Sequence, residues 1–106
     1  MHWIILFVAG ILEVVWAVSM KQSDGFTRLV PTAVTVVAML GSVVLLALAM
    51  KVLPLGTAYT IWTGIGAVGA FVIGIVALGE SATPARLAAA TLIIAGLLLM
   101  KFATPE

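Results

Sequence analysis

The sequence predicts an all-α membrane protein with four transmembrane helices in each subunit. Hydrophobic residues make up 64% of the chain and charged residues only 8%, and the mean hydropathy is +1.34. So few polar residues cannot cover the surface of a water-soluble domain. The apolar residues also fall into separate runs, each near the about 20 residues that a helix needs to cross the hydrocarbon layer.

Short connections join these apolar runs. We place the spans at about residues 3–20, 30–50, 56–78 and 85–101, so that residues 1–106 form a single transmembrane domain. Connections this short make consecutive helices antiparallel neighbours. We therefore expect a tight four-helix unit whose two ends lie on the same side of the membrane.

Turn and cap residues mark the ends of the spans. The Ser-Asp-Gly turn at residues 23–25 follows the first span, and Pro31 falls in the first turn of the second span, where proline is tolerated. Before the fourth span, Thr83 is predicted to be an N-cap, with Pro84 at the first helical position.

The first span carries Glu13 in an otherwise uncharged apolar run. A charge at the bilayer centre costs roughly 2.5 to 3.5 kcal/mol, so a purely structural protein would be more stable with leucine there. A carboxyl group at membrane depth is therefore a functional candidate. The same residue, with no basic residue before the run, argues against a signal peptide, and we expect the span to remain in the mature protein.

Residues near Glu13 in the predicted helices indicate a binding site. Gly10, one turn earlier, leaves room beside the carboxyl group, and Trp16, one turn later, can present its ring or its indole N–H. Trp16 could alternatively anchor the helix at the membrane interface, as we expect of Trp3. Ser42 lies near mid-membrane in the second span, where its hydroxyl can bond a carboxylate or the carbonyl four residues earlier in its own helix.

The third span adds aromatic residues and glycines. Tyr59, Trp62 and Thr63 share one helix face, and a tryptophan in mid-span is too deep for the interfacial belt. Gly64 and Gly66 are predicted to kink the helix. A kink beside an aromatic pair indicates an element that moves.

Basic residues leave the orientation of the chain undecided. Lys21, Arg28 and Arg86 flank the loops on one side of the predicted unit, whereas Lys51 and Lys101 lie on the other. By the positive-inside rule, so small a difference allows insertion in both directions. Two oppositely oriented copies can then pair as an antiparallel homodimer. The alternative is one orientation, set by a single charge.

The fourth span is predicted to form the dimer contact. Its small residues Ala89 and Gly96 lie seven positions apart and share one face, which suits close helix packing in a membrane. The same face could instead pack within the subunit. Four helices can pack with no cavity, whereas two copies bring two Glu13 carboxyl groups towards a shared interior.

Two other classes of protein fit parts of this pattern. An assembly subunit could use Glu13 as a polar contact between helices, and a proton or cation channel could use it as an acidic ring, although no continuous polar stripe follows the spans. The chain has no cysteine and a single histidine, His2. We expect no catalytic residue, cofactor, metal site or nucleic-acid partner.

Several motifs resemble the small multidrug resistance transporters. They are Glu-Val-Val-Trp at residues 13–16, Gly-Phe-Thr-Arg at 25–28, Pro-Leu-Gly-Thr-Ala-Tyr at 54–59 and Ile-Trp-Thr-Gly-Ile-Gly at 61–66. The resemblance covers the whole chain in length, number of spans and loop spacing.

Further positions resemble the guanidinium exporter branch of that family. They are Trp16-Ala17, Thr57 and the Leu-Met-Lys sequence at residues 99–101. The branch that exports polyaromatic drugs typically has Gly-Thr in place of Trp-Ala and isoleucine in place of Thr57. Ala89 departs from the glycine that the family usually has there, but it is still small.

The resemblance implies a dual-topology antiparallel homodimer in the cytoplasmic (inner) membrane that exchanges protons for guanidinium-type cations. Glu13 would bind both proton and substrate, so that the two compete for one group. The resemblance places Trp16, Ser42, Tyr59 and Trp62 around it, and Ser42 with the tryptophan N–H groups would hold the carboxyl group in place. Guanidinium directs its N–H donors rigidly, so carboxylates can accept paired hydrogen bonds from it. Export of quaternary ammonium or polyaromatic cations is the alternative.

Overall fold

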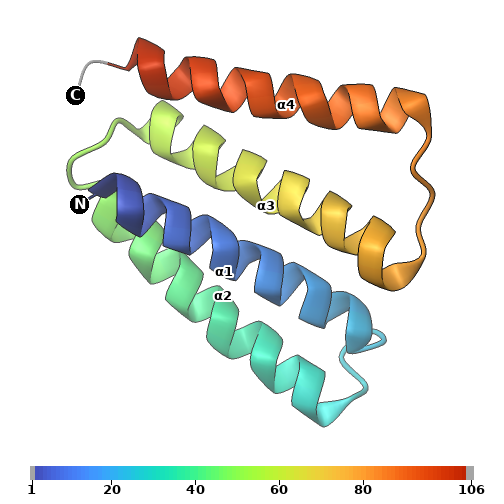
Figure 1. Ribbon diagram of the computed structural model, residues 1–106. Helices are drawn as coiled ribbons and strands as arrows, with labels where there is room; N and C mark the ends of the chain where they lie inside the picture. Colours follow the sequence, from blue (N-terminus) through green and yellow to red (C-terminus); the bar gives the residue numbers. More distant parts are fainter. Residues whose placement is uncertain (1, 105–106) are drawn as a thin grey trace.

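The computed structural model describes residues 2–104 and contains four long α-helices in that range (Figure 1). Positions 1, 105 and 106 of the predicted domain lie outside the described residues. Each helix is long and apolar enough to cross a membrane. The helices are α1 (His2–Gln22), α2 (Leu29–Ala49), α3 (Leu55–Leu78) and α4 (Pro84–Ala103).

Local sequence signals explain where these helices begin and end. The predicted N-cap of α4 is confirmed: Thr83 Oγ1 accepts a hydrogen bond from the Arg86 backbone N–H at 3.2 Å, and Pro84 follows the cap. At the end of α3, Gly79 adopts a left-handed φ of +72°, a conformation that favours glycine.

The connection between α1 and α2 is a turn built around Ser23. Its hydroxyl donates to the Met20 carbonyl at 2.7 Å and accepts from the Phe26 N–H at 3.0 Å. The turn predicted at residues 23–25 is confirmed and extends to Thr27. Because Ser23 is fully buried and satisfies backbone groups on both sides, it fixes the direction in which the chain reverses.

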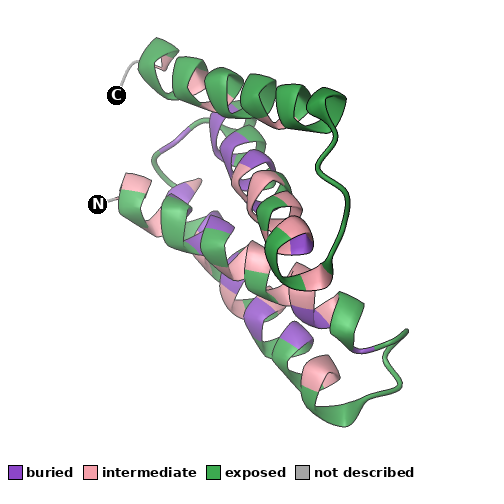
Figure 2. Cartoon of the chain, turned by 45° about the vertical axis from the view of Figure 1, so that its right-hand side comes forward, coloured by how far each residue is buried: buried purple, intermediate pink, exposed green. Residues whose placement is uncertain are grey.

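The helices form an open layer rather than the tight unit that we expected. Helix α1 packs against both α2 and α3, whereas α4 packs along α3 and reaches α1 through the side chain of Lys101, which lies over the Trp3 ring. The molecule measures 43 × 34 × 17 Å, so the layer is thin in one direction. No described residue of α4 is buried, and most of this helix is exposed in Figure 2. Consecutive helices are antiparallel, and the start of α1 and the end of α4 lie at the same end of the layer (Figure 1).

The buried core lies where α1, α2 and α3 meet, towards the end of the layer that carries the chain termini. It contains aliphatic side chains, alanines and one tryptophan. These residues are Leu6, Ala9, Leu46, Ala49, Leu53, Ala58, Ile61 and Trp62. Burial here fixes α1 to α2 and α3 and so determines which face of α1 turns towards α3.

Candidate functional site

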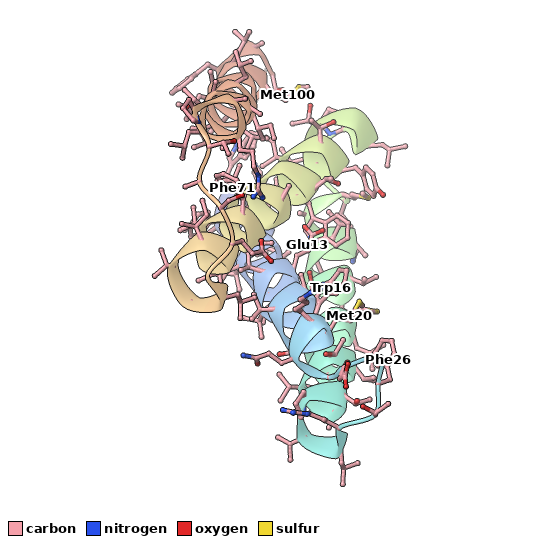
Figure 3. The ribbon with its side chains drawn as sticks, turned by 90° about the vertical axis from the view of Figure 1, so that its right-hand side faces the viewer. Glu13, Trp16, Met20, Phe26, Phe71 and Met100 are labelled. Atoms are coloured by element: carbon pink, nitrogen blue, oxygen red, sulfur yellow. The ribbon has the colours of Figure 1, made fainter. Side chains whose placement is uncertain are left out.

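Glu13 projects from the middle of α1 towards α3 (Figure 3). Its carboxyl group lies directly against Gly66, where a Cβ atom would overlap Glu13 Oε1. Only glycine at this position lets the side chain occupy that space. Oε1 is buried and has no hydrogen-bond partner within residues 2–104. A strong hydrogen-bond acceptor is therefore left unpaired at membrane depth.

A second unpaired atom lies one turn further along α1. Trp16 Nε1 is buried and makes no hydrogen bond with any described residue. Within residues 2–104, it and Glu13 Oε1 are the buried side-chain nitrogen and oxygen atoms without a partner. Each such group costs about 1 to 3 kcal/mol when it stays unpaired. An acceptor and a donor three residues apart on one helix indicate a site for a polar ligand.

Glycines bring α1 and α3 close together on both sides of Glu13. A Cβ atom on Gly10 would lie 2.6 Å from Ile65 Cγ2, and one on Gly69 would collide with Val14. The space that we expected beside Gly10 is therefore filled by Ile65. The Glu13 carboxyl group instead occupies the space above Gly66, a residue that we expected at a helix kink.

Ser42 does not bond the Glu13 carboxyl group, and the expectation that it would do so is wrong for this subunit. Its hydroxyl donates to the Ala9 carbonyl at 2.7 Å and accepts from Trp62 Nε1 at 2.9 Å. The alternative, a bond to its own helix, is also wrong, because the acceptor carbonyl belongs to α1. Ser42 and Trp62 thus link three helices one turn from Glu13, and both are buried.

Tyr59 and Thr63 are exposed, on the flank of α3 that turns towards α4. They line a groove of about 510 Å³ between α3 and α4, together with Gly64 and Gly96. Tyr59 is 53% exposed, and its ring centroid lies 5.6 Å from that of Trp62 at an interplanar angle of 42°. Within residues 2–104, neither residue makes a hydrogen bond to Glu13 Oε1, which has no partner.

The predicted kink and dimer contact remain predictions. Helix α3 runs without interruption through Gly64 and Gly66, and a Cβ atom at Gly64 would meet the Leu97 side chain of α4. Both glycines thus serve close packing in this conformation. Ala89 and Gly96 are exposed on α4.

A cavity that the sequence did not predict lies between α1, α3 and the start of α4, one turn beyond Glu13. It measures about 270 Å³. Its lining includes Ala17, four residues beyond Glu13 in α1, and Ala70, four residues beyond Gly66 in α3. Phe71 and Arg86 also line it, with the guanidinium carbon 5.0 Å from the ring centroid. The i+4 spacing of Ala17 was visible in the sequence, but the pairing of Phe71 with Arg86 was not.

Comparison with known proteins assigns the family of this chain. The sequence model described as "Small Multidrug Resistance protein" matches residues 1–93. The chain belongs to this family. The resemblance found in the motifs is thereby confirmed, and with its four apolar helices this family member is a multi-pass membrane protein.

Relatives of this small multidrug resistance protein carry a more specific name. The "Guanidinium exporter" of Escherichia coli K12 is 61% identical over 104 residues, which cover 98% of this chain and 99% of the relative. Proteins of the same name in Citrobacter freundii and Salmonella typhimurium are 56% identical over the same shares of each chain. Similarity at this level extends over the whole transmembrane layer.

Proposed function

We propose that this protein is a proton-coupled antiporter that exports guanidinium and small guanidinyl cations across the cytoplasmic membrane. Proton and cation compete for Glu13 of each subunit. The names of the relatives support the substrate. The family supports a transporter rather than an enzyme, an assembly subunit or a channel.

One observation carries the proposal: Glu13 Oε1 is buried, faces α3 and has no hydrogen-bond partner among residues 2–104. A proton satisfies this oxygen in one state, and a cationic N–H donor satisfies it in the other. Because both use the same atom, binding of one displaces the other. Such mutual exclusion is the minimum requirement for exchange.

Guanidinium suits this group better than a quaternary ammonium ion does. Its N–H donors lie in one plane and can pair with both oxygens of a carboxylate, whereas a quaternary ammonium ion has no N–H to donate. A site built to accept hydrogen bonds rejects a cation that cannot supply them, because its own polar atoms stay unpaired.

The working form that we propose is an antiparallel homodimer of single four-helix transmembrane domains. No described residue of α4 is buried, and Ala89 and Gly96 are exposed on it, which leaves a surface for a second copy. Tyr59 and Thr63 are exposed in the subunit, so a second copy can bring them into a shared substrate site with Glu13.

Transport currents across a supported membrane test the substrate. Proteoliposomes should give currents with guanidinium and with guanidinium carrying one alkyl tail, and none with tetramethylammonium. Currents with tetramethylammonium or polyaromatic cations and none with guanidinium would assign the protein to drug export instead. A guanidinium current without uphill guanidinium transport when a proton gradient is applied would indicate a channel.

Glu13→Gln tests the role of the carboxyl group in the same assay. The amide keeps the shape but removes the titratable group and the negative charge, so uphill guanidinium transport should cease while the protein still assembles. Asp24→Asn is the matched control, because Asp24 is exposed in the connection between α1 and α2. Uphill transport retained by Glu13→Gln would refute the proposal.

A further inference from the structure

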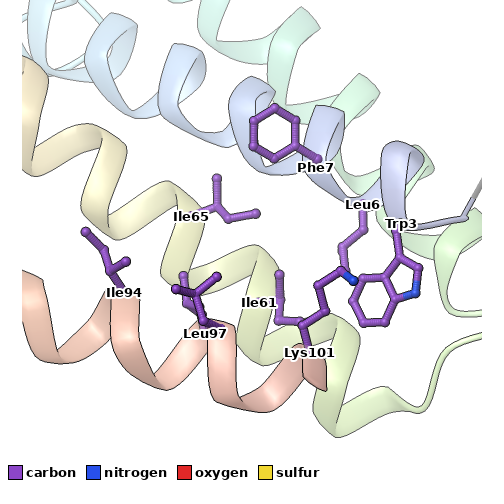
Figure 4. Close-up of a pocket in the computed structure, with 9 residues that line it drawn as sticks. Trp3, Leu6, Phe7, Ile61, Ile65, Ile94, Leu97 and Lys101 are labelled. Carbon is purple, nitrogen blue, oxygen red and sulfur yellow. The ribbon is translucent and has the colours of Figure 1, made fainter. Parts of the chain in front are cut away.

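An apolar groove lies between α1, α3 and α4 (Figure 4). It has a volume of about 290 Å³. Nearly all of its lining is apolar, and the one charged group is Lys101 near the end of α4. The lining residues used below are Trp3, Phe7, Ile94, Leu98 and Lys101.

The mouth of the groove has the chemistry of a membrane interface. The Lys101 Nζ atom lies 4.9 Å from the centroid of the Trp3 ring, and Figure 4 shows the lysine side chain reaching over that ring. Trp3 is near the start of α1 and Lys101 near the end of α4, so both lie at the same end of the layer. Tryptophan and lysine at helix ends are the residues that mark the level of lipid headgroups.

Lys101 has no carboxylate partner among the residues that the structure describes. Of the acidic groups in residues 2–104, Asp24 and Glu80 lie in connections at the opposite end of the layer, and Glu13 lies in the middle of α1. The described contacts of Lys101 are with the rings of Trp3 and Phe102. Its positive charge is therefore available to an anionic ligand at the mouth of the groove.

We propose that this groove binds one chain of an anionic phospholipid, whose phosphate lies on Lys101 and the indole N–H of Trp3. From Lys101 the groove runs inward to Ile94, seven residues along α4, which is a depth of about 10 Å. Part of an acyl chain fits that depth, with its methylene groups against the apolar lining. A basic pocket between transmembrane helices is a known setting for anionic headgroups.

A second copy of the chain is the competing occupant, and the faces of α4 argue against it. Each residue turns a helix by about 100°, so α4 has two flanks beside the face that contacts α3. Leu98 and Lys101 lie on one flank, and Ala89 and Gly96 lie on the other. A dimer formed through Ala89 and Gly96 therefore leaves the groove open to lipid.

Native mass spectrometry of the full-length protein tests the headgroup contact. The purified protein is mixed with equal amounts of phosphatidylglycerol and phosphatidylcholine that carry the same acyl chains. The wild-type protein should retain phosphatidylglycerol in preference, and Lys101→Gln should reduce that preference about fivefold. Lys51→Gln is the matched control, because Lys51 is exposed at the same end of the layer but outside the groove. Equal effects of the two substitutions would overturn the proposal.

A second pair of variants tests the groove itself. Leu98→Trp adds bulk inside the groove, whereas Leu99→Trp adds the same bulk on an exposed face outside it. Leu98→Trp alone should lower phosphatidylglycerol retention, and glycerol phosphate without acyl chains should not bind. If Leu98→Trp instead separates dimers and leaves lipid retention unchanged, the groove belongs to a second copy. Binding of glycerol phosphate equal to that of the lipid would also refute the proposal.

Discussion

The Glu13 carboxyl group of α1 lies directly against the backbone of Gly66 in α3, in the space that a side chain at position 66 would occupy. This contact fixes the separation of the two helices at mid-membrane. It also fixes the direction in which the carboxyl group points, because Val14 and Ile65 fill the spaces on either side.

Gly66→Ala should disturb both packing and transport. The added methyl group would overlap Glu13 Oε1, so the carboxyl group must turn away or the helices must separate. We expect a loss of about 1 to 3 kcal/mol in the free energy of unfolding, as for other overpacked sites, and reduced guanidinium currents. Denaturant unfolding in detergent micelles and transport currents measure the two effects.

Gly41→Ala is the control for that substitution. Its new Cβ atom would lie 3.5 Å from Leu12 Cδ1, an ordinary contact, so stability and transport should change little. If Gly66→Ala behaves like Gly41→Ala, the carboxyl group does not occupy the position described here.

Ser42→Ala should destabilise the subunit by about 1 to 3 kcal/mol, because it leaves Trp62 Nε1 buried without an acceptor. It also removes the hydrogen bond to the Ala9 carbonyl. Thr91→Ala is the control: its hydroxyl bonds Leu87 in its own exposed helix, and its loss should have little effect. Equal unfolding free energies for the two variants would show that the network contributes nothing.

Guanidinium binding should weaken as the pH falls. A proton on Glu13 removes the negative charge and turns an acceptor oxygen into a donor, so the protonated form cannot hold the cation. The apparent Kd should rise about tenfold per pH unit once most of the Glu13 groups are protonated, and it should be constant at higher pH. Isothermal titration calorimetry at several pH values measures this dependence. Asp24→Asn should keep the same profile, and a wild-type Kd that does not change with pH would exclude competition.

Dual topology can be tested by labelling from outside the cell. The chain has no cysteine, so Val52→Cys introduces a single exposed reporter between α2 and α3. A membrane-impermeant maleimide should label about half of the chains if a near balance of basic residues leaves both orientations open. Uniform labelling, or none, would refute dual topology.

Added charge should then lock the orientation. Gln22→Lys and Ala82→Lys, both at exposed positions, add two charges to the end that already has Lys21, Arg28 and Arg86. The reporter at position 52 should become uniformly accessible, and the locked protein should be inactive alone. Activity should return when it is expressed with a version locked in the opposite direction.

The sequence by itself determined the helices and the family. A helix that crosses a membrane satisfies its backbone hydrogen bonds internally, so length and hydropathy suffice to find it. The cap at Thr83 was predictable for a similar reason, because its partner, the Arg86 N–H, lies three residues away. Glu13 stood out because a carboxyl group in an apolar span is costly wherever its neighbours lie.

Only the tertiary structure decided which groups meet. Helical periodicity shows that residues share a face, but not which neighbouring helix lies opposite that face or at what height. Ser42 could bond any nearby acceptor, and its partner, the Ala9 carbonyl, lies 33 residues away. The same limit explains why Gly66 was expected at a kink although it provides the space for Glu13. It also explains why the exposure of α4 along its whole length was not foreseen. Each depends on the packing of α1 against α3, which results from many weak contacts between distant segments.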